Sequence, residues 1–501
     1  MLFLSSFIIM SCQQVNFVKI NDQLPNIVII YTDDLGYGDI SYNGAVGVKT
    51  PNIDRLAKQG LNFSDAHCSA ATCTPSRVAL LTGQYAFRSQ ARILKGDAPL
   101  IIRPGTMTMP SLLKQAGYTT AVVGKWHLGL GNGSVDWNKD VKPGPLEIGF
   151  DYSFLIPATG DRTPCVYLEN YRVVDHDDSD PIEVNYKNRI DKNPIGSEKR
   201  SELKQDYSRG HNMTIVNGIS RIGYMIGGHK ARWVDEDMAD VITVNALNFI
   251  EKNKSKPFFL YFSTHDIHVP RVPHSRFVGK SSMGPRGDAI VQMDWCTGQI
   301  LDKLDELDLS DNTLVIFSSD NGPVLDDGYK DFANEKIGQH KPSGPYKAGK
   351  YSFFEGGTRV PFIVRWPGKV KAGSRSSALM GQIDLCATIA HIAGITVKKE
   401  DCVDSRNAID TLTGKNAVGR PHLIHECRGN LALRQGPWKY IPKGKSRIEL
   451  GPWKEEVIVG EGAIFNLNND ILENSNLSSQ QQKKLNEMKA LIEKIRISGD
   501  N

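Results

Sequence analysis

Four short apolar runs, each followed by a cluster of polar residues, set the pattern of this chain. They occupy residues 26–32, 118–123, 257–263 and 313–319. Continuous runs of β-branched and aromatic residues of this length are typical of parallel strands that are buried on both faces. Ligands of open α/β sheets bind beyond the carboxyl ends of the strands, so the polar clusters are expected to converge on one crevice.

Helical patterns alternate with these runs. Residues 109–116 follow Thr108 as a helix cap, carry a proline in the first turn and end at Gly117. Residues 237–252 place apolar side chains on one helical face, and residues 288–307 carry a similar stripe. The alternation predicts an α/β fold with a large, mostly parallel sheet sandwiched by helices.

The pattern changes after about residue 405. Short antiparallel strands are predicted at residues 421–425, 430–434, 438–441 and 463–466. A helix with an apolar face is predicted over residues 478–497. We therefore expect a smaller C-terminal α+β subdomain over 405–501, after a larger α/β domain over 24–404. Within the latter, residues 155–230 lack clean periodicity and are interpreted as an insertion near the mouth of the site.

Composition and charge exclude little. The 501 residues are 40% hydrophobic and 23% charged, as in an ordinary globular protein. A net charge of +4 gives no reason to expect nucleic acid as a partner. The eight cysteines show no CxxC pair and no zinc-site spacing, so neither a redox motif nor a zinc site is predicted.

The first residues indicate export. The apolar run at the N-terminus has the length of a signal-peptide core and is too short to span a bilayer. Ile9-Met10-Ser11-Cys12 resembles a bacterial lipobox, which implies a lipid anchor at Cys12. We therefore expect residues 1–23 to form a leader and tether. The expected location is the periplasm or outer membrane of a Gram-negative bacterium, as a lipoprotein.

Two of the polar clusters suggest a cation site. Asp33 and Asp34 follow the first apolar run, and Asp320 and Asn321 follow the fourth. Neighbouring carboxylates at a strand end repel each other unless a cation lies between them. A donor set made only of oxygen atoms favours a hard ion, Ca²⁺ or alternatively Mg²⁺, over Zn²⁺.

One stretch carries a far more specific signature. Cys73-Thr-Pro-Ser-Arg77, continued to Thr82-Gly83, resembles the core motif of the type I sulfatases, a family of the alkaline-phosphatase superfamily. Gly124-Lys125-Trp126-His127-Leu128-Gly129 resembles a second motif of this family. The resemblance implies that a maturation enzyme oxidises Cys73 to Cα-formylglycine. The hydrated aldehyde then attacks the sulfur atom of a sulfate ester.

The resemblance also implies roles for residues in the other clusters. Asp33, Asp34, Asp320 and Asn321 would hold the metal, usually calcium, with an oxygen atom of the modified residue 73. Arg77 would pair with the formylglycine or with the metal-bound acids.

Four further residues complete the implied set. Lys125 would bind the sulfate and the diol, and His127 would act as general base on the spare hydroxyl. His268, which stands before Val269-Pro270, would protonate the leaving alcohol. Lys350, which precedes Glu355-Gly-Gly-Thr-Arg359, would neutralise charge near the sulfate.

The predicted function is hydrolysis of sulfate esters with release of inorganic sulfate. The expected substrate is a sulfated mono- or oligosaccharide, of galactose or N-acetylgalactosamine type, and the insertion would contact the sugar. Its candidate residues are Lys187, Arg189, Lys192, Arg209 and His211. Two alternatives stay open at this point. One is a phosphonate monoester or phosphodiester hydrolase with the same nucleophile, and the other is a non-catalytic glycan-binding relative.

Overall fold

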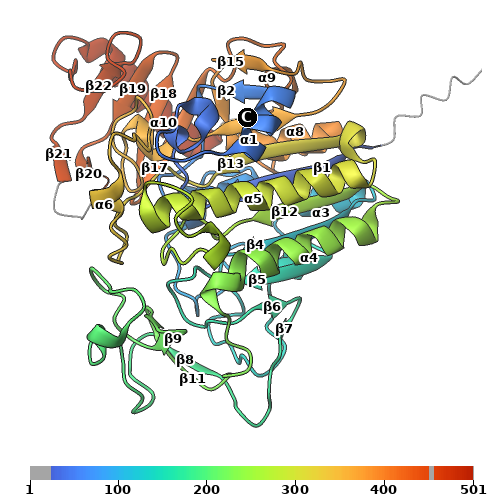
Figure 1. The fold of residues 1–501 in the computed structure, drawn as a ribbon. Coiled ribbons are helices and arrows are strands. Elements are labelled where there is room, and N and C mark those ends of the chain that lie inside the picture. The colour runs from blue at the N-terminus through green and yellow to red at the C-terminus, as the bar shows by residue number, and fades with distance from the viewer. Residues whose placement is uncertain (1–23, 449, 451–455, 500–501) are drawn as a thin grey trace, which may run out of the picture.

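A ten-stranded sheet forms the centre of the protein. The computed structural model describes residues 24–448, 450 and 456–499 (Figure 1). The strand order is β15-β2-β14-β13-β1-β12-β4-β5-β6-β7. In chain order these strands are β1 (Asn26–Thr32), β2 (Leu61–Phe63), β4 (Thr119–Lys125), β5 (Tyr152–Ile156), β6 (Leu168–Glu169), β7 (Arg172–Val173), β12 (Phe258–Ser263), β13 (Thr313–Ser319), β14 (Phe362–Arg365) and β15 (Ser374–Ser376).

The middle of this sheet is parallel, as predicted. β13, β1, β12, β4 and β5 are successive parallel neighbours, and the antiparallel strands lie toward the two edges. Every residue of β1, β12 and β13 is buried, which explains why their sequences are continuously apolar. The predicted strands 26–32 and 313–319 are confirmed at both ends, and the other two are displaced by one or two residues.

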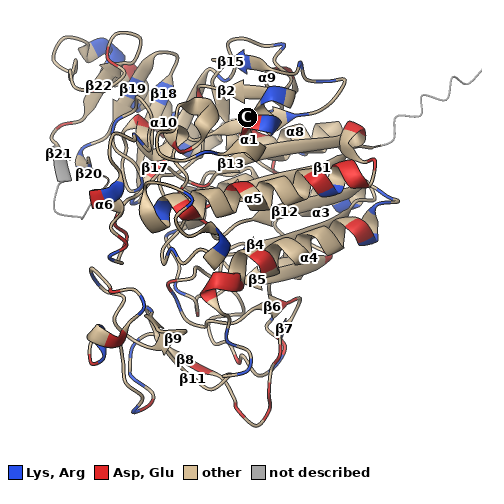
Figure 2. Ribbon diagram, viewed as in Figure 1, with Lys and Arg blue, Asp and Glu red and all other residues tan. Residues whose placement is uncertain are grey.

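Helices pack against the sheet in two groups. α5 (Gly284–Glu306) contacts both α1 (Pro51–Gln59) and α4 (Met238–Asn253), and α4 and α5 lie in front of the strands in Figure 1. α2 (Cys73–Thr82), α3 (Met109–Gln115) and α8 (Leu385–Ile392) form the second group. The predicted sandwich is therefore confirmed. Figure 2 shows basic and acidic residues interspersed along the ribbon, in keeping with the small net charge.

Local sequence signals predicted the start of α3 correctly but not the start of α5. The Thr108 side chain accepts a hydrogen bond from the Ser111 backbone N–H, so this residue caps α3 as predicted. α5 begins at Gly284, four residues before the predicted start. Its first turn contains Pro285, a residue whose fixed φ suits that position.

A four-stranded antiparallel sheet forms the C-terminal part. It consists of β17 (His422–Cys427), β18 (Asn430–Gln435), β19 (Trp438–Ile441) and β22 (Ala463–Asn466). α10 (Gln482–Ser498) contacts β18 and β19 through a buried face that includes Leu485, Met488, Ile492 and Ile495. The predicted helix start at residue 478 is wrong by four residues. The Ser478 N–H donates to the Asn476 side chain, so this segment is a turn that precedes the helix.

The segment 155–230 is built from short pieces. Two of them, β6 and β7, extend the main sheet, and four more form two-stranded sheets. The latter are β8 (Glu183–Asn185) with β11 (Tyr224–Ile226), and β9 (Ile215–Val216) with β10 (Ile219–Ser220). In the described part of the chain, no helix has both the length and the apolar character needed to cross a membrane. The predicted leader, with Cys12, lies outside the described residues.

Candidate active site

The polar clusters after β1 and β13 meet because the two strands are adjacent. Thr32 lies beside Ser319 in the parallel register, so the residues that follow both strands emerge at the same edge. The Asp34 backbone N–H donates to Asp320 Oδ1 at 3.3 Å. Asp33, Asp34, Asp320 and Cys73 each offer one ligand atom, and these four atoms lie within 4.8 Å of one another. The expected convergence is thus confirmed for these segments.

The donor set fits a hard cation. The Asn321 amide nitrogen donates to Asp34 Oδ1 at 2.7 Å and to the Gly322 carbonyl at 2.9 Å. Its oxygen, Oδ1, is buried and has no hydrogen-bond partner among the described residues. Burial and the neighbouring Asp320 raise the pKa of Asp33, although Lys125 opposes them. Buried carboxylates and an unpaired amide oxygen are the ligands that Ca²⁺ and Mg²⁺ prefer.

Two buried cationic side chains form ion pairs with these acids. Arg77, on α2, donates to Asp320 Oδ2 from Nε at 2.9 Å and from Nη2 at 2.8 Å, and it also contacts the Ser263 hydroxyl. Lys125, at the end of β4, donates to Asp33 and lies 3.5 Å from Asp320 Oδ2. All these side chains are buried. The ion pairs are therefore poorly screened by water and hold the carboxylates in place.

Lys350 is the third cation that pairs with the acidic cluster. The sequence predicted one of its partners, Asp34, but not the other, Asp327. The Lys350 Nζ lies 2.8 Å from Asp34 Oδ1 and 2.9 Å from Asp327 Oδ2. Asp327 also accepts hydrogen bonds from Tyr351 at 3.1 Å and from Arg209 at 3.3 Å. Its only sequence signal was an Asp-Asp pair in a loop, which by itself is typical of a solvated turn.

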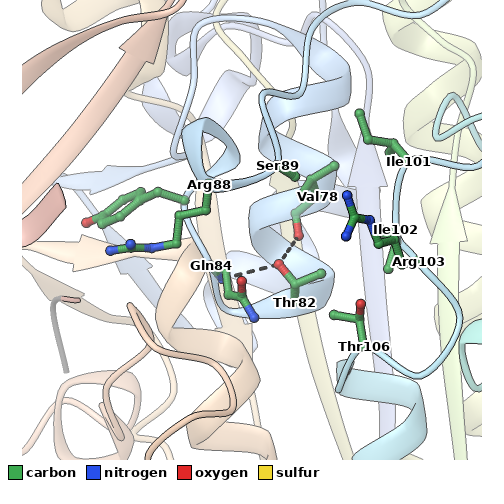
Figure 3. A pocket seen from close by; sticks show the side chains of 10 residues that line it. Val78, Thr82, Gln84, Arg88, Ser89, Ile101, Ile102, Arg103 and Thr106 are labelled. Atoms are coloured by element: carbon green, nitrogen blue, oxygen red, sulfur yellow. Dashed lines mark hydrogen bonds between the residues drawn. The ribbon is translucent and has the colours of Figure 1, made fainter. Parts of the chain in front are cut away.

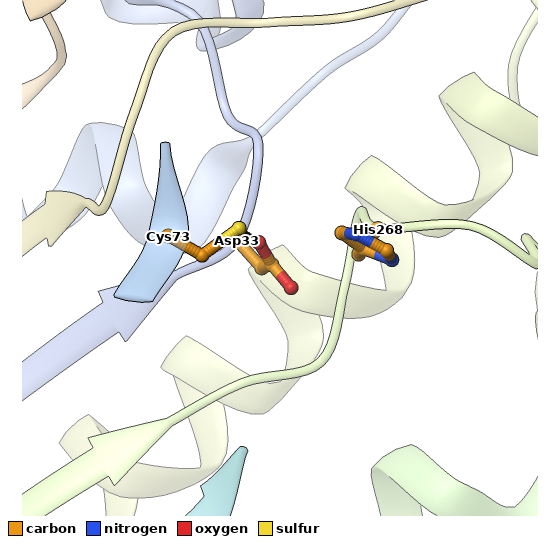
Figure 4. Close-up of side chains that lie close together, drawn as sticks. All are labelled: Asp33, Cys73 and His268. Carbon is orange, nitrogen blue, oxygen red and sulfur yellow. Dashed lines mark hydrogen bonds between the residues drawn. The ribbon is translucent and has the colours of Figure 1, made fainter. Parts of the chain in front are cut away.

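Cys73 stands at the first position of α2. Its side chain is 1% exposed, and its Sγ lies 3.6 Å from Asp33 Oδ1 (Figure 4). Burial raises the pKa of the thiol, although Lys125 and Lys350 oppose the shift. Residue 73 as cysteine is therefore a neutral thiol beside the acidic cluster, which makes it a poor nucleophile.

His127 and His268 approach the site from the ends of two further strands. His127 Nε2 is 3.0 Å from the Leu94 carbonyl, and its Nδ1 has no partner among the described residues. A carbonyl only accepts, so Nε2 carries the proton and Nδ1 is a free base. His268 Nδ1 is 2.7 Å from the Val269 carbonyl, and its Nε2 is 3.9 Å from Asp34 Oδ2. Figure 4 shows His268 on the side of Asp33 away from Cys73.

The insertion reaches this site through a second set of polar contacts. Arg162 Nη1 lies 2.7 Å from Asp161 Oδ1, and His211 Nε2 lies 2.9 Å from Asp161 Oδ2. Burial, then Lys125 and then the charge of Arg162 lower the pKa of His127. Sequence reasoning named His211 and Arg209 in the insertion but missed Asp161 and Arg162. The other candidates, Lys187, Arg189 and Lys192, are exposed.

Glu355 and Arg359 make structural contacts, as expected from the sequence. Glu355 Oε2 is 3.1 Å from Arg359 and 2.6 Å from Arg434, and its Oε1 is 2.9 Å from Lys439. Arg434 and Lys439 belong to β18 and β19, so this buried carboxylate joins the two sheets. Removing one partner of such a network leaves an unpaired buried charge, which costs about 3–5 kcal/mol.

A cavity of about 290 Å³ lies at the other end of α2 (Figure 3). Thr82 lines it, and the Thr82 hydroxyl donates to the Val78 carbonyl at 2.7 Å. Gln84, Arg88 and Arg103 also line it. None of the predicted site residues lines this cavity. It lies at the C-terminal end of α2, whereas Cys73 lies at the N-terminal end.

The fold and the site together bring a buried acidic cluster, three cations and the N-terminus of α2 to one edge of a parallel sheet, an arrangement suited to ester hydrolysis. The family model described as Sulfatase matches residues 25–395. The chain belongs to the type I sulfatase family and is a sulfuric ester hydrolase. This family uses a metal ion and a formylglycine. Sulfate-ester hydrolysis is therefore favoured over the two alternatives that the sequence left open, a phosphonate monoester or phosphodiester hydrolase and a non-catalytic glycan-binding relative.

Known relatives extend over nearly the whole chain. An N-acetylgalactosamine-6-O-sulfatase of Bacteroides thetaiotaomicron is 48% identical over 480 residues, which are 95% of this chain and 94% of that protein. Human steryl-sulfatase is 32% identical, over 82% of this chain and 74% of that protein. A solved sulfatase structure, from work on the metabolism of multiple glycosaminoglycans by Bacteroides thetaiotaomicron, has a TM-score of 0.92 at 48% identity. It covers 94% of this chain and 99% of its own.

Proposed function

We propose that this sulfatase removes O-sulfate from carbohydrates and that 6-O-sulfated N-acetylgalactosamine is its preferred substrate unit. The supporting observation is the 48% identity, across nearly both full lengths, to a protein named for that activity. The site supports the same class of reaction, since three buried cations, Arg77, Lys125 and Lys350, surround the acidic cluster.

The charge of the site suits a sulfate monoester. Four buried carboxylates, those of Asp33, Asp34, Asp320 and Asp327, are paired with these three cations. Arg209 also contacts Asp327, so with all eight groups ionised the charges cancel. A divalent cation would then make the site positive, which suits the negative charge of a sulfate ester. Asp33, Asp34, Asp320 and Asn321 would hold that ion, and we propose Ca²⁺, with Mg²⁺ as the alternative.

The residue at 73 supplies the nucleophile in this proposal. Converted to Cα-formylglycine and hydrated, it would offer a hydroxyl for attack on sulfur. A cation held by Asp33, Asp34, Asp320 and Asn321 would supply the positive charge that lowers the pKa of that hydroxyl. Arg77 and Lys125 hold the acids beside it and contribute positive charge toward the sulfuryl oxygens. Lys350 does the same from the Asp34 side.

His268 would protonate the leaving alcohol from Nε2 in its imidazolium form, because its Nδ1–H is held by the Val269 carbonyl. Burial and Lys350 lower the pKa of His268, and the negative charge of a bound sulfate ester would oppose that shift.

His127 is the proposed base, because its Nδ1 carries a lone pair and has no partner among the described residues. It takes the proton of the spare hydroxyl, so sulfate leaves and the aldehyde is restored. Burial and Lys125 lower the pKa of His127 well below its usual value. The imidazole therefore stays in the basic form at neutral and mildly acidic pH.

Substitution of His127 tests this assignment. Asparagine is the suitable replacement because His127 has φ 55°, a left-handed conformation that asparagine tolerates. We expect His127→Asn to lower kcat by about 10²–10⁴-fold with little change in KM. His265→Asn is the matched control, since His265 is also buried at this edge but has no proposed role. An equal loss in the two variants would contradict a specific role for His127.

The insertion over 155–230 is the proposed sugar-recognition segment. Arg209 contacts Asp327, which in turn contacts Lys350, so the insertion is connected directly to the site. Asp161 and Arg162 add two groups that can hydrogen-bond a hydroxyl. In this division of the chain, residues 24–404 perform the chemistry and residues 405–501 support it through contacts such as those of Glu355.

Maturation is proposed to precede folding. Every residue of α2, from Cys73 to Thr82, is buried. A maturation enzyme could not reach the motif in the folded protein, so it must act on the extended chain.

We further propose export as a lipoprotein anchored at Cys12. Incorporation of labelled fatty acid should be lost in Cys12→Ala, and unchanged labelling would contradict the anchor.

A panel of defined substrates tests the proposed specificity. It uses protein whose residue 73 is shown by mass to carry the aldehyde. We expect kcat/KM for N-acetylgalactosamine 6-sulfate to exceed that for the 4-sulfate and for N-acetylglucosamine 6-sulfate by at least about 10²-fold. Aryl sulfate, steryl sulfate and an aryl phosphodiester complete the panel. Preference for any of these three would overturn the carbohydrate assignment.

A further inference from the structure

A pair of buried cysteines lies outside the active site, near the C-terminal end of α2. Cys386 belongs to α8, and Cys402 lies sixteen residues later, in the loop that follows. Their Sγ atoms are 2.9 Å apart, and neither residue is exposed to solvent. A disulfide has its sulfur atoms about 2.05 Å apart, so a movement of less than about 1 Å would join them.

The side chains of this pair converge on one point. A Cβ built on Gly83, the residue that ends α2, would lie 2.7 Å from the Cys402 Cβ and 3.0 Å from the Cys386 Cβ. Gly83 has φ 63°, a left-handed conformation that glycine adopts without strain. The two β-carbons therefore both lie beside the helix end and close to each other, as a disulfide bond requires.

We propose that Cys386 and Cys402 form a structural disulfide bond when the chain folds in an oxidising compartment. The oxidant is a disulfide, carried by a thiol–disulfide oxidoreductase or by oxidised glutathione. One cysteine attacks it as a thiolate and forms a mixed disulfide, which the other cysteine resolves. The protein loses two protons and two electrons, and the oxidant is reduced to two thiols.

The burial of the pair fixes when this happens. Neither thiol is accessible after folding, and contact with Cys402 together with burial raises the pKa of Cys386. The thiolate needed for exchange is therefore scarce in the folded protein, so the bond forms before α8 packs against α2. Once formed, it is protected from reductants by the same burial.

The bond would secure the loop that holds the end of α2. The Asp404 N–H donates to the Gly83 carbonyl at 3.0 Å, and the Asp404 carboxylate accepts from the Tyr85 N–H at 2.8 Å. Arg88 also donates to Asp404, at 2.6 and 2.7 Å. Because α2 carries Cys73 at its other end, a tether here stabilises the helix that positions the nucleophile.

Peptide mapping tests the bond directly. The full chain is directed into a bacterial periplasm by a heterologous leader, denatured, alkylated without reductant and digested with trypsin. We expect residues 376–398 and 400–406, which contain the two cysteines, to appear as one linked species that separates on reduction. Alkylation of both cysteines in the exported protein would overturn the proposal. The test is independent of sulfatase activity and of the chain's own location.

Thermal unfolding provides a second readout. Closing a loop of this length in a chain of this size predicts that Cys386→Ala, Cys402→Ala and the double variant each lower Tm by about 3 °C, with equal losses in all three. Cys296→Ala measures the loss from a lone buried cysteine and should give a smaller shift. Parent protein made in a reducing cytoplasm should have the lower Tm as well. Additive losses in the two single variants would show two independent thiols.

Discussion

The Cys73→Ala protein is expected to fold normally and to lose at least about 10⁴-fold of its kcat. In other hydrolases, removal of the nucleophile alone abolishes almost all catalysis, because the remaining groups act only in concert with it. Folding should survive the change. Cys73 Sγ makes one polar contact, at 3.6 Å to Asp33, and alanine is a good residue for the first turn of a helix.

Two measurements are needed for this variant. Hydrolysis of a sulfated sugar gives kcat, and thermal unfolding shows whether the structure is retained. Cys296→Ala is the matched control, because that cysteine is equally buried but lies on α5, where its Sγ contacts the Ala239 carbonyl of α4. We expect the control to retain its kcat within about threefold. More than about 1% of parental kcat in Cys73→Ala would rule out residue 73 as the nucleophile.

The strands and the main helices could be predicted because their signals are local. Residues 26–32 and 313–319 are continuous apolar runs, and the structure has strands with the same ends. Their adjacency in the sheet is not a local property. Neither run indicates that Thr32 lies beside Ser319. This pairing brings the two acidic clusters together.

The site residues were predictable where they follow a buried strand or lie in a recognisable motif. Cys73, Lys125 and His127 lie in runs that resemble family motifs, and the structure places the first two beside the same carboxylates. Asp327 and Arg162 lie in irregular segments and acquire their partners through tertiary contacts with Lys350 and Asp161. Their sequence surroundings are indistinguishable from solvated loops, so only the fold identifies them.

The second large effect concerns the cation. We expect chelation to lower both kcat and Tm, and Ca²⁺ to restore them, because an ion that binds only the folded protein stabilises it in proportion to RT ln(1 + [L]/Kd). In Asp34→Asn, Tm should no longer respond to added Ca²⁺ in the range where the parent responds. Its kcat should fall about 10³-fold, since Lys350 and Asn321 then face a neutral amide instead of a carboxylate.

Asp294→Asn separates this effect from the loss of any buried acid. Asp294 accepts hydrogen bonds from the Asn52 and Ile53 N–H groups at the start of α1, and burial raises its pKa to about 6. Its replacement should change Tm while leaving the Tm response to Ca²⁺ intact, because no donor of the proposed site is altered. If Asp34→Asn kept the parental response, the carboxylates at the ends of β1 and β13 would not be the ligands. The three buried cations would then be balanced by the acids alone.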